Sequence, residues 1–228
     1  MKKAVSGFLI TLTVVIFATI AQAGTDKVQT PPKAPEGYIV VEEDVVTVLS
    51  DEHEQYFQKA HQAFLKKNNK TAAADIRKAV AFMKLDAAVA PGEGKKALSD
   101  SVNELEKLAD DTEKGKVASA KVLEQAFSRA DYALAKEYHL KASASWVKKA
   151  TKEVGHSLKT AADNLEYGLA WAGHKADAGG NAAIRDARLI AGKLIEGTGW
   201  VPDEVGKGIE FIGKEVEKFG SKVEPSKR

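Results

Sequence analysis

The sequence predicts an all-α protein: an antiparallel helical bundle with one very long helix, a short extended N-terminal arm and a C-terminal amphipathic helix. Two observations support this fold class. Along most of the chain the apolar residues recur every three or four positions, which places them on one side of an α-helix. Aromatic residues make up only 7% of the chain and alanine is abundant, which favours small side chains between closely packed helices.

Residues 1–23 have the features of an export signal. Lys2 and Lys3 provide the positive start, residues 8–20 form an apolar centre, and Ala-Gln-Ala at the end is a small-x-small cleavage site. The alternative is a membrane anchor, but the apolar centre is short for a full span. We therefore expect cleavage after Ala23 and a periplasmic or secreted protein.

Charge and cysteine content exclude several classes of protein. The chain has 34 basic and 32 acidic residues, and the predicted signal removes two lysines and no acid, so the mature chain is nominally neutral. A neutral chain of mixed charge lacks the basic face that a nucleic-acid binder needs. Because the chain contains no cysteine, it is not a lipoprotein and has no disulfide, thiolate metal site or thiol chemistry.

Residues 24–49 are predicted to precede the bundle as an extended segment. Proline is frequent up to Gly37, as in a linker, and the β-branched residues that follow are typical of a strand-like arm. We expect that arm to lie on the bundle, since two short strands alone are marginal in water.

The bundle itself is expected over residues 50–176, and its first three helices show clear apolar faces. Ser50 and Asp51 are suitable caps for the first helix, and Thr71 opens the second. The third helix is expected over residues 95–114, after a Pro-Gly break. The side chains predicted to point inward are Tyr56, Phe57, Ala60, Phe64, Leu65, Ala72, Ile76, Ala79, Val80, Met83, Leu98, Val102, Leu105 and Ala109.

Residues 116–174 form the longest stretch of helical periodicity. The stretch contains no proline, and as one helix it would be about 88 Å long at roughly 1.5 Å per residue. Such a helix is too long to pack on one ordinary domain without a break or a projecting end. If there is a break, the pattern places it in residues 136–145, where the apolar face lapses through Glu137 and Lys141.

Within residues 177–228, a glycine recurs at every seventh position from Gly192 to Gly220. A joint at Gly179 and Gly180 is expected to precede a helix over residues 184–195, and Asp203 is expected to cap a last helix that runs to Lys222. The repeated glycines are Gly192, Gly199, Gly206, Gly213 and Gly220. Beside them, apolar residues alternate in steps of four and three, as in a short coiled coil.

Two interpretations of this last helix are open. Either it closes the same bundle, or it docks on a second copy, a protein partner or a membrane surface, the last through residues 184–222. The alternating acids weaken the membrane version, since they repel anionic headgroups. The predicted partner-binding residues are Val205, Gly206, Ile209, Ile212, Gly213, Val216, Phe219 and Gly220.

Metal-binding patterns are weak. Glu153 and His156 lie three residues apart on one predicted helix face, like the Glu-x-x-His pairs of carboxylate-bridged di-iron bundles, but the second pair is absent. Met83 with a histidine could ligate a b-type haem, although no positive sign of haem is present. A surface copper, zinc or nickel site at His53, Glu54 and His61 would need further ligands, because histidines eight residues apart are two helical turns apart.

No catalytic motif is present. The sequence has no Gly-rich phosphate loop, no His-Glu-x-x-His and no Gly-x-Ser-x-Gly. We therefore predict a non-enzymatic exported helical bundle without a cofactor or an evident small-molecule substrate, acting through protein contacts as a scaffold, adaptor or stress-type binding protein. The alternatives are a metal- or haem-binding bundle with a sensing or redox role and a peripheral membrane-associated protein.

Overall fold

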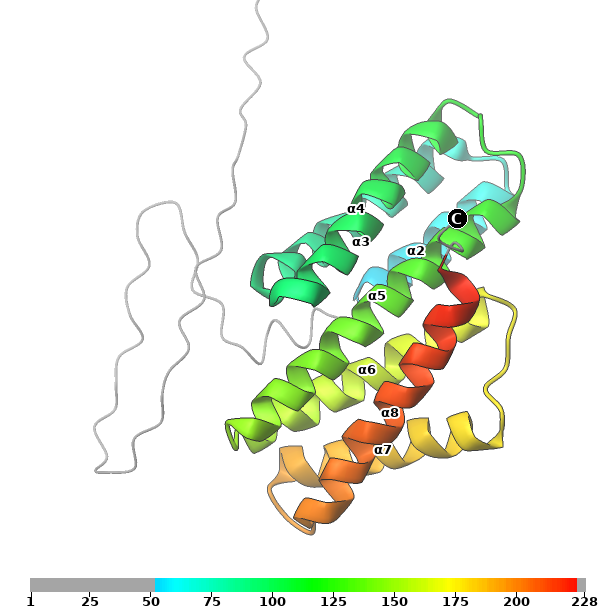
Figure 1. Ribbon diagram of the computed structural model, residues 1–228. Coiled ribbons are helices and arrows are strands. Elements are labelled where there is room, and N and C mark those ends of the chain that lie inside the picture. The colour runs from blue at the N-terminus through cyan, green and yellow to red at the C-terminus, as the bar shows by residue number, and fades with distance from the viewer. Residues whose placement is uncertain (1–51, 225–228) are drawn as a thin grey trace, which may run out of the picture. The chain divides into compact units, whose positions relative to one another are not determined.

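The computed structural model describes residues 52–224, which form seven α-helices (Figure 1). They are α2 (Glu52–Leu65), α3 (Asn69–Val89), α4 (Gly92–Glu113), α5 (Ala120–Val147), α6 (Thr151–Trp171), α7 (Ala178–Glu196) and α8 (Pro202–Val223). These residues contain no strand, so the predicted all-α bundle is confirmed. The predicted signal and N-terminal arm lie outside the described residues.

Helix α5 lies at the centre of the bundle. It packs against α2 and α4 on one side and against α6 and α8 on the other (Figure 1). Helix α3 packs on α2 and α4, and α7 packs on α6 and α8. Because α5 contacts both groups of helices, its two faces decide how α2–α4 and α6–α8 are held together.

The prediction of one very long helix is wrong. The stretch divides into α5 and α6, of 28 and 21 residues, which pack against each other. The break lies at residues 148–150, after the predicted window, where Lys149 has a left-handed backbone with φ of 59°. The prediction takes Glu137 as a lapse in the apolar face, but this residue is buried. The buried face of α5 therefore continues through Glu137.

The first three helices follow the predicted pattern closely. All predicted inward residues of α3 and α4 are buried, but Leu65 at the end of α2 is 62% exposed. Helix α3 begins two residues before the predicted Thr71, because Asn68 is its cap and accepts a hydrogen bond from the Thr71 amide at 3.3 Å. Pro91 precedes the first turn of α4.

The predicted joint at Gly179 and Gly180 is also wrong. Both glycines lie in the first turn of α7, where the Asp177 carboxylate caps the helix and accepts from the Gly180 amide at 2.9 Å. Helix α7 ends at Gly197, whose φ of 76° is left-handed. Helix α8 begins at Pro202. Asp203 therefore lies inside the helix and is not its cap, contrary to the prediction.

Candidate functional site

The residues predicted to bind a partner lie on the buried face of α8. Seven of the eight are buried within this chain, and Gly206 is partly exposed. Helix α8 therefore closes the bundle on α5, α6 and α7, as in the first of the two interpretations. A partner could reach these side chains only if α8 left the bundle.

Only part of the glycine repeat has a packing role. A Cβ on Gly213 would lie 2.5 Å from His139 Nε2, and one on Gly220 would lie 2.5 Å from the Tyr132 ring. Gly206 and Gly192 have no neighbouring atom within 4 Å of an added Cβ. Two of the repeated glycines thus allow α8 to approach α5, while the others meet open space.

The predicted metal ligands Glu153 and His156 are both partly exposed on α6. Within residues 52–224, no group of three or more histidine, aspartate or glutamate side chains is arranged to hold a metal ion. Binding at this pair remains a prediction that elemental analysis of the purified protein can test. The alternative of a surface metal site at His53, Glu54 and His61 is wrong, since His53 and Glu54 are buried.

His53 and Glu54 belong instead to a buried polar cluster that joins α2 to α5 and α6. His53 Nε2 lies 3.1 Å from Asp131 Oδ1 on α5. The indole N–H of Trp171, at the end of α6, donates to Glu54 Oε2 at 2.9 Å. Gln58 donates to the other Glu54 oxygen at 2.9 Å. Polar contacts therefore link three helices at a buried position, where a polar group without a hydrogen-bond partner would destabilise the fold.

Asp131 is the least satisfied member of this cluster. Its side chain is fully buried, and its Oδ2 has no hydrogen-bond partner. Burial raises the pKa of Asp131 to about 7, although the hydrogen bond and charge of His53 act in the opposite direction. Burial also raises the pKa of Glu54, against the hydrogen bonds from Trp171 and Gln58. The cluster thus contains two carboxyl groups that disfavour ionisation.

Aromatic rings surround the cluster on the side of α6. Phe57 stacks on Phe127 with ring centroids 4.2 Å apart, and the edge of Trp171 meets Phe127 at 5.2 Å. His61 meets the Trp171 ring at 5.3 Å and its Nε2 lies 2.9 Å from Glu124 Oε1. The orientation of Trp171 and Glu124 is therefore set by side chains of α2.

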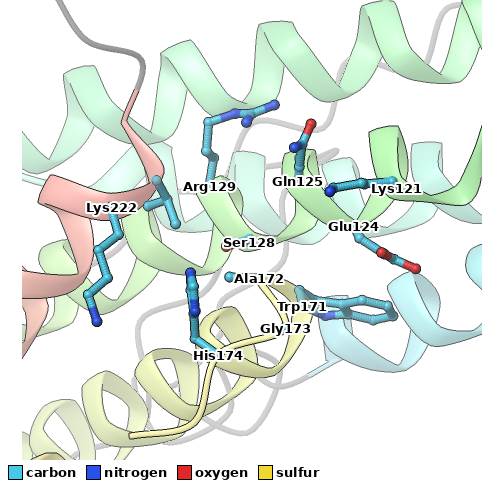
Figure 2. A pocket seen from close by; sticks show the side chains of 11 residues that line it. Lys121, Glu124, Gln125, Ser128, Arg129, Trp171, Ala172, Gly173, His174 and Lys222 are labelled. Atoms are coloured by element: carbon cyan, nitrogen blue, oxygen red, sulfur yellow. The ribbon is translucent and has the colours of Figure 1, made fainter.

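Trp171 and Glu124 also line a surface pocket of about 490 Å³ (Figure 2). Its walls come from α5, from the end of α6 with the residues after it, and from the end of α8. Figure 2 shows Ser128 at the middle of this group, with Lys222 on one side and Lys121 on the other. The lining residues are Lys121, Glu124, Gln125, Ser128, Arg129, Trp171, Ala172, Gly173, His174, Lys222 and Val223.

The local sequence explains how the α6 end supplies this wall. Gly173 adopts a left-handed backbone with φ of 69°, which ends α6. The His174 amide then donates back to the Leu169 carbonyl at 2.9 Å. His174 consequently follows Trp171 by one tight turn, and both side chains line the pocket.

The unpaired charges of the pocket are positive. Arg129 is bound by Glu104 and Glu124 is bound by His61. Among the described residues, the side chains of Lys121, His174 and Lys222 form no hydrogen bond or ion pair. The Ser128 hydroxyl donates to the Gly168 carbonyl at 3.0 Å. The pocket therefore offers cationic side chains beside an indole ring, without an activated hydroxyl.

Sequence reasoning missed the pocket and the buried cluster. Asp131 follows the apolar residues Phe127 and Ala130 on the same face of the predicted helix, so an acid among inward-facing positions was the available signal.

Comparisons with protein-family models, curated proteins and solved structures found no match for this chain. Within residues 52–224, no helix is both long and apolar enough to span a bilayer.

Proposed function

We propose that this chain is an exported, non-enzymatic binding protein, and that acidic side chains of a partner protein bind in the pocket beside Trp171. The observation that carries the proposal is a group of side chains without an ionic partner around one cavity: two lysines, Lys121 and Lys222, and the imidazole of His174. Carboxylates are attracted to such a group, and the pocket's own carboxylate, Glu124, is already bound by His61.

The pocket suits a protein side chain better than a small molecule. Its volume of about 490 Å³ is in the range of ligand sites, but such sites are mostly apolar and enclose the ligand. Here Lys121, His174 and Lys222 are exposed at the rim, and Trp171 is half-buried. Exposed charges of this kind steer and select a partner more than they retain a free ligand.

Titration with a glutamate-rich peptide, followed by calorimetry and by the Trp171 indole NMR signal, tests the proposal. We expect the Lys121→Gln, Lys222→Gln double variant to bind about tenfold more weakly, since two exposed ion pairs contribute roughly 0.2–1 kcal/mol each. The matched control is Lys148→Gln with Lys207→Gln, which removes the same charge from exposed positions outside the pocket. The affinity should also fall as salt is added.

Three results would contradict the proposal. The first is equal binding of a glutamine-rich peptide of the same length. The second is equal loss of affinity in the control variant. The third is binding of succinate or inorganic phosphate as tight as that of the peptide, which would identify a site for small anions.

A second candidate function, attachment to a membrane surface, is favoured by exposed apolar side chains in the predicted residues 184–222. Leu189 on α7 is 60% exposed and Phe211 on α8 is 47% exposed. Flotation with anionic vesicles tests it, with Phe211→Ser as the variant that should lose binding. Flotation that does not depend on Phe211 would speak against this surface.

A further inference from the structure

We propose that α2 is a pH-sensitive latch, which holds the pocket walls in mild acid and loosens when the buried Asp131 ionises. The consequence for binding rests on the proposed function, but the latch itself is a property of the bundle. It depends on the contacts that α2 makes with α5 and α6, and each of these can be followed without any ligand.

The first step is that α2 positions two pocket walls although it contributes no residue to the pocket. His61 binds the Glu124 carboxylate at 2.9 Å and meets the Trp171 ring. Glu54 accepts the Trp171 indole N–H at 2.9 Å. If α2 moved away, the indole would lose its acceptor and Glu124 would be released beside Lys121.

The second step is that the attachment of α2 to α5 includes a buried ionisable pair. His53 is 1% exposed and Asp131 is fully buried, and one contact of 3.1 Å joins them. The titratable groups facing Asp131 are His53 and Glu54, both from α2. From α6, Gly168 packs against it so closely that an added Cβ would lie 3.1 Å from Asp131 Cβ, and it brings no charge.

The third step is the sign of the pH effect. Burial raises the pKa of Asp131 to about 7, so the closed state holds this proton more tightly than an open state in which water reaches the carboxyl group. Protonation therefore favours closure. As the pH rises from Asp131's ordinary range through about 7, the closed state loses this advantage and carries two carboxylates, Glu54 and Asp131, beside one imidazole.

The fourth step connects the latch to binding. Once α2 loosens, Glu124 is no longer held by His61 and can pair with Lys121, three residues earlier on α5. The pocket then loses part of its positive charge, and Trp171 loses its fixed orientation. An acidic partner should accordingly bind more tightly in mild acid than above neutral pH.

Hydrogen exchange measured by mass spectrometry tests the latch on the free protein. Protection factors of the α2 amides, which correct for the intrinsic pH dependence of exchange, should fall on the order of tenfold more than those of α6 between about pH 5.5 and about pH 8. In Asp131→Asn this difference should disappear, because the amide cannot ionise. Glu137→Gln is the matched control: it neutralises another buried carboxyl group of α5, one that lies against α4 instead of α2.

Unchanged pH dependence of α2 protection in Asp131→Asn, or its loss in Glu137→Gln, would overturn the latch. If Asp131→Asn does not fold, the wild-type protein still decides the question. The ¹³Cγ shift of Asp131 must then titrate with the same midpoint as α2 protection, and different midpoints would refute the proposal.

A separate arm measures binding of the glutamate-rich peptide at the two pH values in a His174→Gln background, which removes the imidazole of the pocket itself. Tighter binding in mild acid that Asp131→Asn abolishes supports control of the pocket by α2. A latch seen by exchange without any peptide binding would reject the proposed function and leave the latch standing. Peptide binding without pH-dependent exchange would reject the latch alone.

Discussion

The two faces of α5 are built on different principles. Toward α2–α4 the helix presents buried groups that can ionise, namely Asp131 and Glu137. Toward α8 it presents the rings of Tyr132 and His139, each packed against a glycine. Ionisation of the carboxyl groups should weaken the contacts of the first face, and added side-chain volume at the glycines should weaken those of the second. Two kinds of contact therefore hold α5 in the bundle, and different perturbations should separate them.

The face toward α2–α4 contains a second polar contact besides the cluster at His53. Tyr138 donates to Asp86 on α3 at 2.6 Å, and Glu137 lies against Gly94 on α4. Burial raises the pKa of Glu137 to about 7, while the charge of Lys141 acts in the opposite direction. Glu137 Oε2 has no hydrogen-bond partner, as at Asp131. Ionisation of the buried carboxyl groups on this face therefore lowers the free energy of unfolding.

The face toward α8 depends on close approach. Tyr132 meets the edge of Phe219 with ring centroids 6.0 Å apart and covers Gly220. His139 covers Gly213, and burial lowers the pKa of this imidazole. A side chain at either glycine would push the rings away, so the contact is limited by space.

The largest effect should come from filling that space. Gly213→Leu should destabilise the protein by about 3 kcal/mol, because its Cβ would lie 2.5 Å from His139 Nε2 in a well-packed core. Gly206→Leu is the matched control on the same helix, since an added Cβ there has no neighbour within 4 Å. Urea unfolding measures both changes. Equal destabilisation by the two variants would remove the distinction between the glycines of α8.

The second effect is a stability that falls as the pH rises. Asp131 and Glu137 hold their protons more tightly in the folded state than in the unfolded state, because burial raises both pKa values to about 7. Their contribution to the free energy of unfolding should therefore be largest below about pH 4 and decline by on the order of 2 kcal/mol as the pH rises to about 7. Denaturant unfolding at several pH values measures the decline.

Isosteric variants assign this pH dependence to the polar face. Asp131→Asn should flatten the curve and make the protein more stable than wild type at about pH 8, since the charge that is costly to bury is gone. Gly220→Ala, which perturbs the other face beside Tyr132, should shift the whole curve without changing its slope. A slope unchanged in Asp131→Asn would show that other groups cause the decline.

A smaller effect tests the link between α2 and the pocket. Trp171→Phe removes the donor to Glu54 and should cost about 1–2 kcal/mol, since a buried carboxyl group loses a hydrogen bond. Trp146→Phe is the matched control. The Trp146 ring packs edge-to-face with Trp200, with ring centroids 6.1 Å apart, and its indole takes no part in the polar cluster. Thermal unfolding of both variants gives the difference. A cost no greater at Trp171 than at Trp146 would mean that the indole bond adds nothing.

The sequence predicted what depends on local spacing and missed what depends on tertiary partners. Ile76, Met83 and Leu105 were identified as core residues because helical periodicity alone decides which side they occupy. The break at Lys149 was misplaced, since a lysine in a left-handed conformation has no distinct sequence signal. The pair of Asp131 and His53 joins residues 78 positions apart, which periodicity cannot relate.

The smallest effect concerns the glycines that meet open space, and it has the opposite sign. Gly206→Ala and Gly192→Ala should each stabilise the protein by roughly 0.5–1 kcal/mol, because alanine loses less backbone entropy in a helix and no atom lies within 4 Å of the new Cβ. Gly213→Ala should destabilise it, since the imidazole of His139 must shift. If all three variants shifted stability in the same direction, the seven-residue repeat would act as one unit, and the close contacts of α8 with α5 would not explain where its glycines are needed.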